Sequence, residues 1–472
     1  MSTVTIGSAE GAEGGAERVP HRGARGVIHS FATYIETARA QRPHPSTRDA
    51  VLRCLTDLLA AAAAGCREPG VRAVRRVARD TMRDGDVPIW FSGQRSSALG
   101  AAWANSAAAA ALDLDDGHRI ARGHPGAAVI PVALAVARTT GASPDRLVNA
   151  IAIGYEVGVS IAAARTSYGN TGTWSACAVV ATAAALREVA ADRIAHALAI
   201  AEESAPNQLF LSAPAQAVRP EGSDVKEGIA WSVVTGMTAL DLAEAGYTGP
   251  RNRLDSPLHY GFPDDFVAGA AGHVHHVYFK LHACCRHVHA PLDALIALMT
   301  RHRIDPASIE SIEVWTYGGA LRITNKVRPE HLADVQYSIP YCLALVALRG
   351  ERALLPLTAR ALGDDAATAL AMRVHVRLDP SLDARFPAQT LARVAVTSHG
   401  VRYESDVTAP RGEADMPLTD RELEAKFADA TREVASEAQR EQMLGALRDA
   451  RGGDFTALDC SLTHLDLVDR RS

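Results

Sequence analysis

The chain of 472 residues exceeds the size of one ordinary hydrophobic core, so we expect two domains. A net charge of −5 argues against a nucleic-acid-binding surface, and charged residues interrupt every apolar run before it reaches membrane-spanning length. Seven cysteines at irregular spacing are typical of a reducing compartment and not of a disulfide framework. We therefore expect a cytoplasmic protein with neither nucleic-acid nor membrane partners.

The N-terminal half of the chain has the pattern of an all-helical domain. Residues 1–26 are rich in Gly, Ala and Glu and lack the apolar stretch of a signal peptide, so we expect a disordered tail there. Helical periodicity then dominates residues 27–266, and abundant alanine favours helices that pack closely. We expect helices at residues 48–64, 71–82, 97–111, 127–139, 145–164, 175–189, 194–204 and 225–245, and a short strand at 87–91.

The pattern changes after residue 266. Residues 267–405 alternate strand-like and helical runs, which predicts an α+β domain, and residues 406–472 return to helix and dock on the first domain. The predicted fold is mainly α, with a large helical domain and a smaller α+β domain. Strands are expected at residues 273–279, 309–316, 372–378, 392–398 and 401–403, and helices at 288–302, 339–348, 422–435 and 440–449.

The densest group of reactive side chains lies in residues 109–131, between two apolar helical runs. Such a polar segment can hold a site on a rigid frame. The alternative is a solvent-facing loop in which an aspartate caps a helix. Three carboxylates and two imidazoles fall within twelve positions: Asp113, Asp115, Asp116, His118 and His124.

A second cluster occupies residues 279–294, directly before an expected helix. Three interpretations apply: a metal site, a turn with surface histidines, or an anion pocket in which Lys280 and Arg286 neutralise substrate carboxylates. The spacing matches no tetrahedral metal pattern, even with the nearby histidines at 273–276, so we expect no metal. The cluster comprises Lys280, His282, Cys284, Cys285, Arg286, His287 and His289.

Taken together, the two clusters resemble the MmgE/PrpD family, which holds 2-methylcitrate dehydratase, cis-aconitate decarboxylase and iminodisuccinate epimerase. Residues 113–117 with His124-Pro125 are similar to the family's D-F-D-D-T and H-P, and residues 280–294 to its K-P-Y-P-x-C-R-x-x-H-x-x-x-D-A. Smaller similarities follow in the family's order at residues 154–157, Lys226 and 337–341. The departures are Gly117 for threonine, Ala110 for histidine, and residues 170–174 for the usual H-P-T.

The resemblance implies a helical domain with an α+β lid, a cleft site between them, a homodimer, and catalysis without metal or organic cofactor. The Ala-rich helices of residues 97–245 point to the same homodimer. In this interpretation Asp113 or His124 is the base, His289 is the acid and Lys226 assists catalysis, with Asp113 fixing the tautomer of His124. The expected substrate-binding residues are Lys280, Arg286, Cys285, Arg122 and Tyr341.

The expected activity is that of a cofactor-independent lyase of the dehydratase type. Its substrate is a small di- or tricarboxylate, and its intermediate is an α-carbanion or enolate. A decarboxylase or an epimerase is a close alternative, because all three reactions begin from the same intermediate. A non-catalytic or metal-binding protein on the same scaffold is the alternative from a different class.

Overall fold

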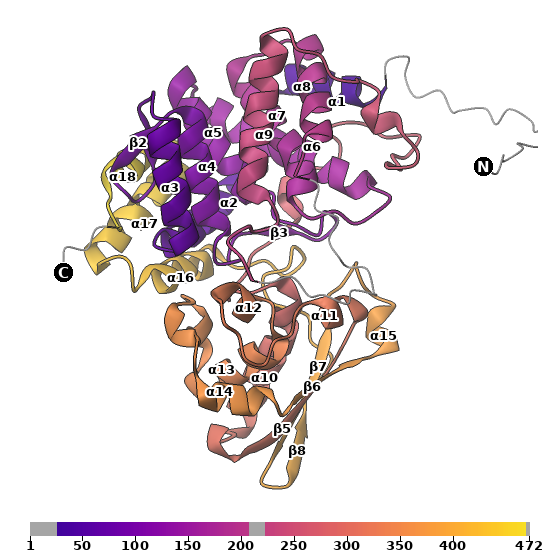
Figure 1. Ribbon diagram of the computed structural model, residues 1–472, viewed down its shortest axis with the longest axis vertical. Coiled ribbons are helices and arrows are strands. Elements are labelled where there is room, and N and C mark those ends of the chain that lie inside the picture. The colour runs from indigo at the N-terminus through magenta and orange to yellow at the C-terminus, as the bar shows by residue number, and fades with distance from the viewer. Residues whose placement is uncertain (1–25, 207–221, 469–472) are drawn as a thin grey trace, which may run out of the picture.

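The computed structural model describes residues 26–206 and 222–468. Figure 1 shows two bodies, a large helical one built mainly from the N-terminal part of the chain and a smaller one that carries a sheet. This arrangement confirms the predicted class, a mainly α fold with an α+β second domain. The expected tail at residues 1–26 lies outside the described residues, apart from Gly26.

Helices of the large body approach one another closely because small side chains line their contacts. A Cβ on Gly154 would lie 2.0 Å from the hydroxyl of Thr182, so α6 (Pro144–Ala164) and α7 (Gly172–Arg187) meet at a distance that glycine permits. The other helices are α1 (Val27–Ala38), α2 (Pro45–Gly65), α3 (Pro69–Thr81), α4 (Ala98–Ala110), α5 (Gly126–Thr140), α8 (Ala191–Glu203) and α9 (Ile229–Glu244).

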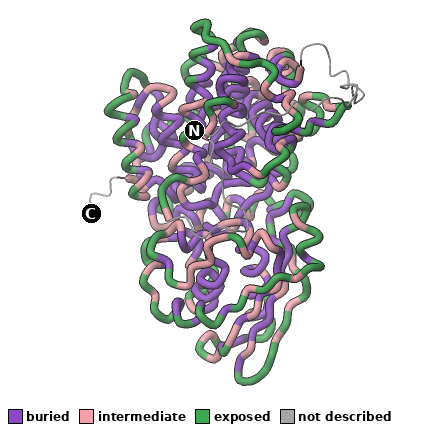
Figure 2. The backbone as a smooth tube through the Cα atoms, turned by 45° about the vertical axis from the view of Figure 1, so that its right-hand side comes forward, coloured by how far each residue is buried: buried purple, intermediate pink, exposed green. Residues whose placement is uncertain are grey.

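One described helix, α6, is long and apolar enough to cross a membrane. Of its most apolar stretch, 83% is buried inside the protein, where it packs against α7. Figure 2 shows the same buried character along the backbone through the centre of the large body. The apolar composition of α6 is therefore that of a core helix.

Three expected elements differ from the observed ones. The strand expected at 87–91 is the hairpin of β1 (Val87–Ile89) and β2 (Gln94–Ser96), and the helix expected from residue 225 begins at Ile229. The strand expected at 273–279 is mostly a 3₁₀ turn, followed by β4 (Val277–Tyr278). The Glu156 carboxylate accepts the N–H groups of Ala271 and His273, both at 3.0 Å, and this contact holds the turn.

The smaller body is a four-stranded mixed sheet covered by helices. The strand order is β6-β5-β7-β8, with β5 parallel to β6 and antiparallel to β7. Helix α10 packs on β7 and on α13, and the side chains between these three elements form the core of this body. The elements are α10 (Arg286–His302), β5 (Ile309–Thr316), α11 (Gly318–Arg322), α12 (Leu332–Gln336), α13 (Ile339–Arg349), α14 (Asp365–Ala371), β6 (Val374–Leu378), α15 (Pro380–Asp383), β7 (Ala392–Ser398) and β8 (Val401–Glu404).

The C-terminal segment returns to the helical body, where Figure 1 shows it in yellow beside α2 and α3. Helix α16 (Asp420–Thr431) packs on α2, and α17 (Glu437–Arg451) packs on α18 (Thr456–His464). The ammonium of Lys426 donates to the Asp57 carboxylate and, at 2.8 Å, to the Leu114 carbonyl. This fully buried pair ties the end of the chain to the segment that carries Asp113.

Candidate active site

A short strand pairing brings the two sequence clusters together at the junction of the two bodies. β3 (Gly117–His118) pairs antiparallel with β4, so that Gly117 lies opposite Tyr278. Two residues beyond β4, the Lys280 ammonium donates to the Asp113 Oδ1 atom at 2.5 Å. Both side chains are buried, with exposed fractions of 0% and 3%. A carboxylate of one cluster thus neutralises a cation of the other.

Asp113 stays ionised in this setting. Burial alone would raise its pKa, but the charges of Lys280, Lys226 and His124 together outweigh burial and hold the pKa well below its usual range. Burial likewise lowers the pKa of Lys280, and Asp113 with Asp115 overcomes it, so the ammonium stays protonated. Asp113 also adopts a left-handed backbone with φ of 52°, three residues after the end of α4.

His124 lies between the carboxylates of this segment. Its Nδ1 atom is 2.7 Å from the Asp116 carbonyl oxygen, and its Nε2 atom is 3.5 Å from Asp113 Oδ1. Because a carbonyl oxygen only accepts hydrogen bonds, Nδ1 carries a proton, and Nε2 faces the Asp113 carboxylate. The Asp116 carbonyl, and not Asp113 as expected, fixes the tautomer.

Asp116 and Thr171 position His124. The Asp116 carboxylate accepts the Gly126 N–H at 3.0 Å, at the start of α5, and the Tyr155 hydroxyl at 2.6 Å. Burial raises the pKa of Asp116 to about 7. The Thr171 hydroxyl accepts the His124 N–H at 3.1 Å. The Asp116 carboxylate therefore has a structural role at the start of α5.

Lys226 approaches the same group from the turn before α9. Its ammonium donates to the Gln336 side chain and lies 4.8 Å from the ring centre of Tyr337. Burial raises the pKa of Tyr337, and the negative charge of Asp113 raises it further. The tyrosine beside the site is therefore Tyr337, not the expected Tyr341. The hydroxyl of Tyr341 donates to the Ala361 carbonyl at 2.6 Å, within the core of the smaller body.

Arg286 is held by an internal carboxylate. Its Nε atom donates to Glu413 Oε1 at 3.0 Å, and Arg119 donates to the same carboxylate, whose pKa these cations hold below its usual range against the opposing effect of burial. The guanidinium carbon lies 4.4 Å from the ring centre of Tyr278. Within the described part of the chain, the buried Nη1 atom of Arg286 has no hydrogen-bond partner. One donor thus remains for a substrate carboxylate.

The histidines at the start of α10 divide into two groups. His289, the expected acid, is 1% exposed, and its Nε2 atom lies 3.2 Å from the Cys284 carbonyl oxygen. The structure does not bring His289 to His124. His287 is half-buried and lies 2.5 Å from the Tyr317 hydroxyl. Burial lowers the pKa of His287 to about 4 against the opposing charge of Asp113, so its ring is neutral.

Cys285 and Arg122 lie at the edge of the group. Burial raises the pKa of Cys285 to about 12, so it remains a thiol. The charge of Asp113 also raises this pKa, and the charge of Lys280 lowers it. Arg122 is exposed, and its guanidinium carbon lies 4.7 Å from the ring centre of Tyr168. Six residues near this group were not predicted as site residues from the sequence: Tyr168, Tyr278, His287, Gln336, Tyr337 and Glu413. Tyr337 and His287 had a signal, because they lie in the 337–341 motif and in the second cluster, and Tyr278 lies in the strand expected at 273–279.

The structure also gathers a group of ligand atoms that the sequence spacing did not indicate. Asp113, Asp115 and His124 each offer an atom within 4.8 Å of the others, a separation that a metal ion can bridge. The Lys280 ammonium already contacts Asp113, and His124 Nδ1 is bound to a carbonyl oxygen. These contacts favour Lys280 as the resident cation of this group.

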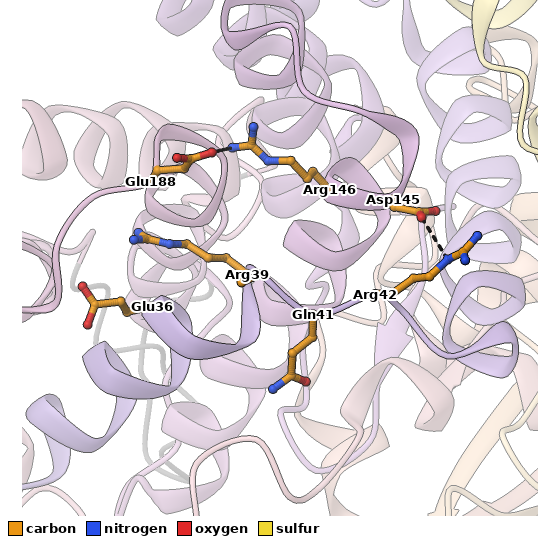
Figure 3. A pocket seen from close by; sticks show the side chains of 8 residues that line it. Glu36, Arg39, Gln41, Arg42, Asp145, Arg146 and Glu188 are labelled. Carbon is orange, nitrogen blue, oxygen red and sulfur yellow. Dashed lines mark ion pairs between the residues drawn. The ribbon is translucent and has the colours of Figure 1, made fainter.

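A separate surface pocket of about 630 Å³ lies on the helical body between α1 and the ends of α6 and α7. Figure 3 shows two ion pairs among its charged side chains, Arg42 with Asp145 at 3.2 Å and Arg146 with Glu188 at 2.7 Å. None of its lining residues belongs to the group around His124.

Comparison with known families agrees with the pairing of the two clusters. Residues 29–271 match the MmgE/PrpD N-terminal domain, and residues 282–449 match the MmgE/PrpD C-terminal domain. The chain belongs to the MmgE/PrpD family. The family includes dehydratases and related enzymes. The boundary between the two matches falls at β4, the strand that carries Tyr278. No curated protein matches the chain.

Proposed function

We propose that this MmgE/PrpD protein is a cofactor-independent lyase of the dehydratase type that acts on a small di- or tricarboxylate. The observation that carries the proposal is the His124 ring, with Nδ1 bound to the Asp116 carbonyl and Nε2 beside the Asp113–Lys280 pair. An imidazole whose Nδ1 is held by a carbonyl oxygen, and whose Nε2 faces a group of carboxylate and ammonium side chains, suits the role of a general base. We further propose a homodimer in the cytoplasm.

The charges around His124 suit the abstraction of a proton α to a carboxylate. Nε2 takes this proton, and the electron pair of the C–H bond moves toward the substrate carboxylate, which becomes more negative. In the absence of a metal, cations and hydrogen-bond donors stabilise that charge. Lys280, Lys226 and the unpartnered Nη1 of Arg286 supply them. In a dehydration the electron pair then forms the C=C bond while the C–O bond to the β-hydroxyl breaks, and the hydroxyl leaves as water with the proton that His124 Nε2 took up.

The three related reactions separate in one NMR experiment. Purified protein is incubated in deuterated water with a panel of small hydroxylated and unsaturated di- and tricarboxylates. We expect loss of water. Loss of carbon dioxide would identify a decarboxylase, and deuterium at the α-carbon without net reaction would identify an epimerase. The absence of any reaction across the panel would favour the non-catalytic alternative.

The group of Asp113, Asp115 and His124 is the specific observation that favours a metal-binding protein. Metal analysis of active protein decides between the two interpretations. We expect no stoichiometric metal and no loss of activity on chelation. Activity that is lost on chelation and restored by zinc or iron would overturn the proposed mechanism.

Arg286→Lys tests the anion pocket without leaving Glu413 unpaired. The variant keeps a positive charge for Glu413 but lacks the Nη1 donor. A charge-assisted hydrogen bond contributes roughly 1.5–3 kcal/mol, so kcat/KM should fall at least tenfold. The melting temperature should fall as well, because the variant loses the Nη2 bonds to the Pro410 and Arg411 carbonyls, so kcat/KM is measured below the melting temperature of the variant. Unchanged kinetics would remove Arg286 from substrate binding.

A further inference from the structure

The register of β3 and β4 makes Gly117 and Tyr278 a matched pair. A Cβ on Gly117 would lie 2.3 Å from both the hydroxyl oxygen and the adjacent ring carbon of Tyr278. The backbone φ of Gly117 is outside the left-handed region, so its conformation does not require glycine. The requirement is one of space: the phenol fills the volume in which any side chain at position 117 would begin.

The phenol of Tyr278 lies among the cations of the site. Its ring centre is 4.4 Å from the guanidinium carbon of Arg286 and 5.9 Å from that of Arg119. The positive charge of Lys280 also acts on its hydroxyl. Tyr278 is 6% exposed. Burial raises its pKa, against the opposing effect of these cations, so the hydroxyl keeps its proton at neutral pH. It is therefore a hydrogen-bond donor on a ring that lies against the Arg286 guanidinium, whose Nη1 atom has no hydrogen-bond partner among the described residues.

We propose that the Tyr278 hydroxyl donates a hydrogen bond to the substrate carboxylate that binds Arg286, and that residue 117 is glycine in order to admit the phenol. This inference rests on the proposed function, because it assigns a donor within the same carboxylate pocket. The family motif has a threonine hydroxyl where this chain has Gly117. Here the Tyr278 hydroxyl occupies, from the opposite strand, the volume in which a side chain at position 117 would begin.

Binding of a non-reacting carboxylate tests this donor without turnover. Tricarballylate and succinate are titrated into the full-length protein and its variants by calorimetry. Tyr278→Phe removes the hydroxyl and keeps the ring, and should weaken binding by about tenfold or more, as expected for a hydrogen bond to a charged group. Tyr403→Phe, on β8 of the smaller body, is the matched control and should bind as the unmodified protein does.

A double variant tests the pairing of the two positions. Gly117→Ala should displace the phenol and weaken binding at least as much as Tyr278→Phe does. In a Tyr278→Ala background the added Ala at position 117 meets no ring, so it should cause no further loss. Additive losses in the double variant would show that Gly117 acts independently of Tyr278.

The outcomes separate this proposal from the proposed function. Unchanged binding by Tyr278→Phe, with its melting temperature intact, would overturn the donor even if the enzyme is a dehydratase. Weakened binding by Tyr278→Phe in a protein that shows no turnover would support the donor and contradict the lyase. If the unmodified protein binds neither probe, the carboxylate pocket itself is wrong.

Discussion

At the scale of single residues, the ring of His124 decides whether the proposed chemistry is correct. His124→Gln keeps a polar side chain of similar size but cannot take up a proton. We expect kcat to fall by about 10²–10⁴, the usual contribution of general acid–base catalysis, while the melting temperature changes little. Steady-state kinetics with the substrate identified by NMR measure the effect.

His289 provides the comparison for His124. The structure buries its ring against the Cys284 carbonyl, so His289→Gln should affect stability more than turnover. If His289→Gln abolishes activity while His124→Gln remains near normal, the base and acid assignments are both wrong.

Buried His118 predicts acid sensitivity of the folded state. Burial, together with His273, His276 and Arg119, lowers its pKa from 6.5 to about 3. Because the unfolded chain then binds a proton that the folded chain rejects, stability present above pH 6.5 is lost as the pH falls. Between pH 8 and pH 5 the loss is about 2 kcal/mol.

Replacement of His118 by leucine isolates this contribution. Urea unfolding of His118→Leu should show a smaller difference in stability between pH 8 and pH 5 than the unmodified protein does. Replacement of the exposed His302 by leucine should leave that difference as it is in the unmodified protein. An unchanged pH dependence in His118→Leu would show that its ring does not remain neutral in the fold.

At the scale of elements, α16 is joined to α2 by the buried pair of Lys426 and Asp57. Lys426→Met would leave the Asp57 carboxylate buried without its cation, and removal of one partner of such a pair costs about 3–5 kcal/mol. We expect that loss of stability in urea unfolding. Arg448→Met breaks the solvent-exposed pair with Glu424 and should cost far less. Equal effects of the two substitutions would contradict the role of burial.

Most helices could be predicted from periodicity, because their apolar residues repeat along single segments. The strand at 273–279 could not, since the turn there depends on Glu156, more than a hundred residues away. Tyr337 and Tyr341 lie in one motif, and only the start of α13 at Ile339 shows which of them enters the core. Glu413 belongs to no motif, although its carboxylate accepts a hydrogen bond from Arg286.

At the scale of the whole molecule, we expect a homodimer formed through the helical body. On α9 the Trp231 side chain is 55% exposed and packs edge-on against Trp103 at 5.7 Å, and Leu242 on the same helix is 38% exposed. Light scattering at micromolar concentration should give twice the 50.0 kDa of one chain. Trp231→Lys should shift the mass toward that of one chain if α9 forms the contact. A monomeric mass for the unmodified protein would refute the prediction.

The pairing of α16 with α2 also sets an order of events during protein synthesis. Asp57 and Lys426 are 369 residues apart, and Lys426 also binds the Leu114 carbonyl, next to Asp113. While the ribosome is still translating the sheet-bearing body, the nascent helical bundle lacks α16, and the carboxylate of Asp57 has no cation. The Asp57 carboxylate therefore gains its cation only after α16 has been translated, 369 residues after Asp57.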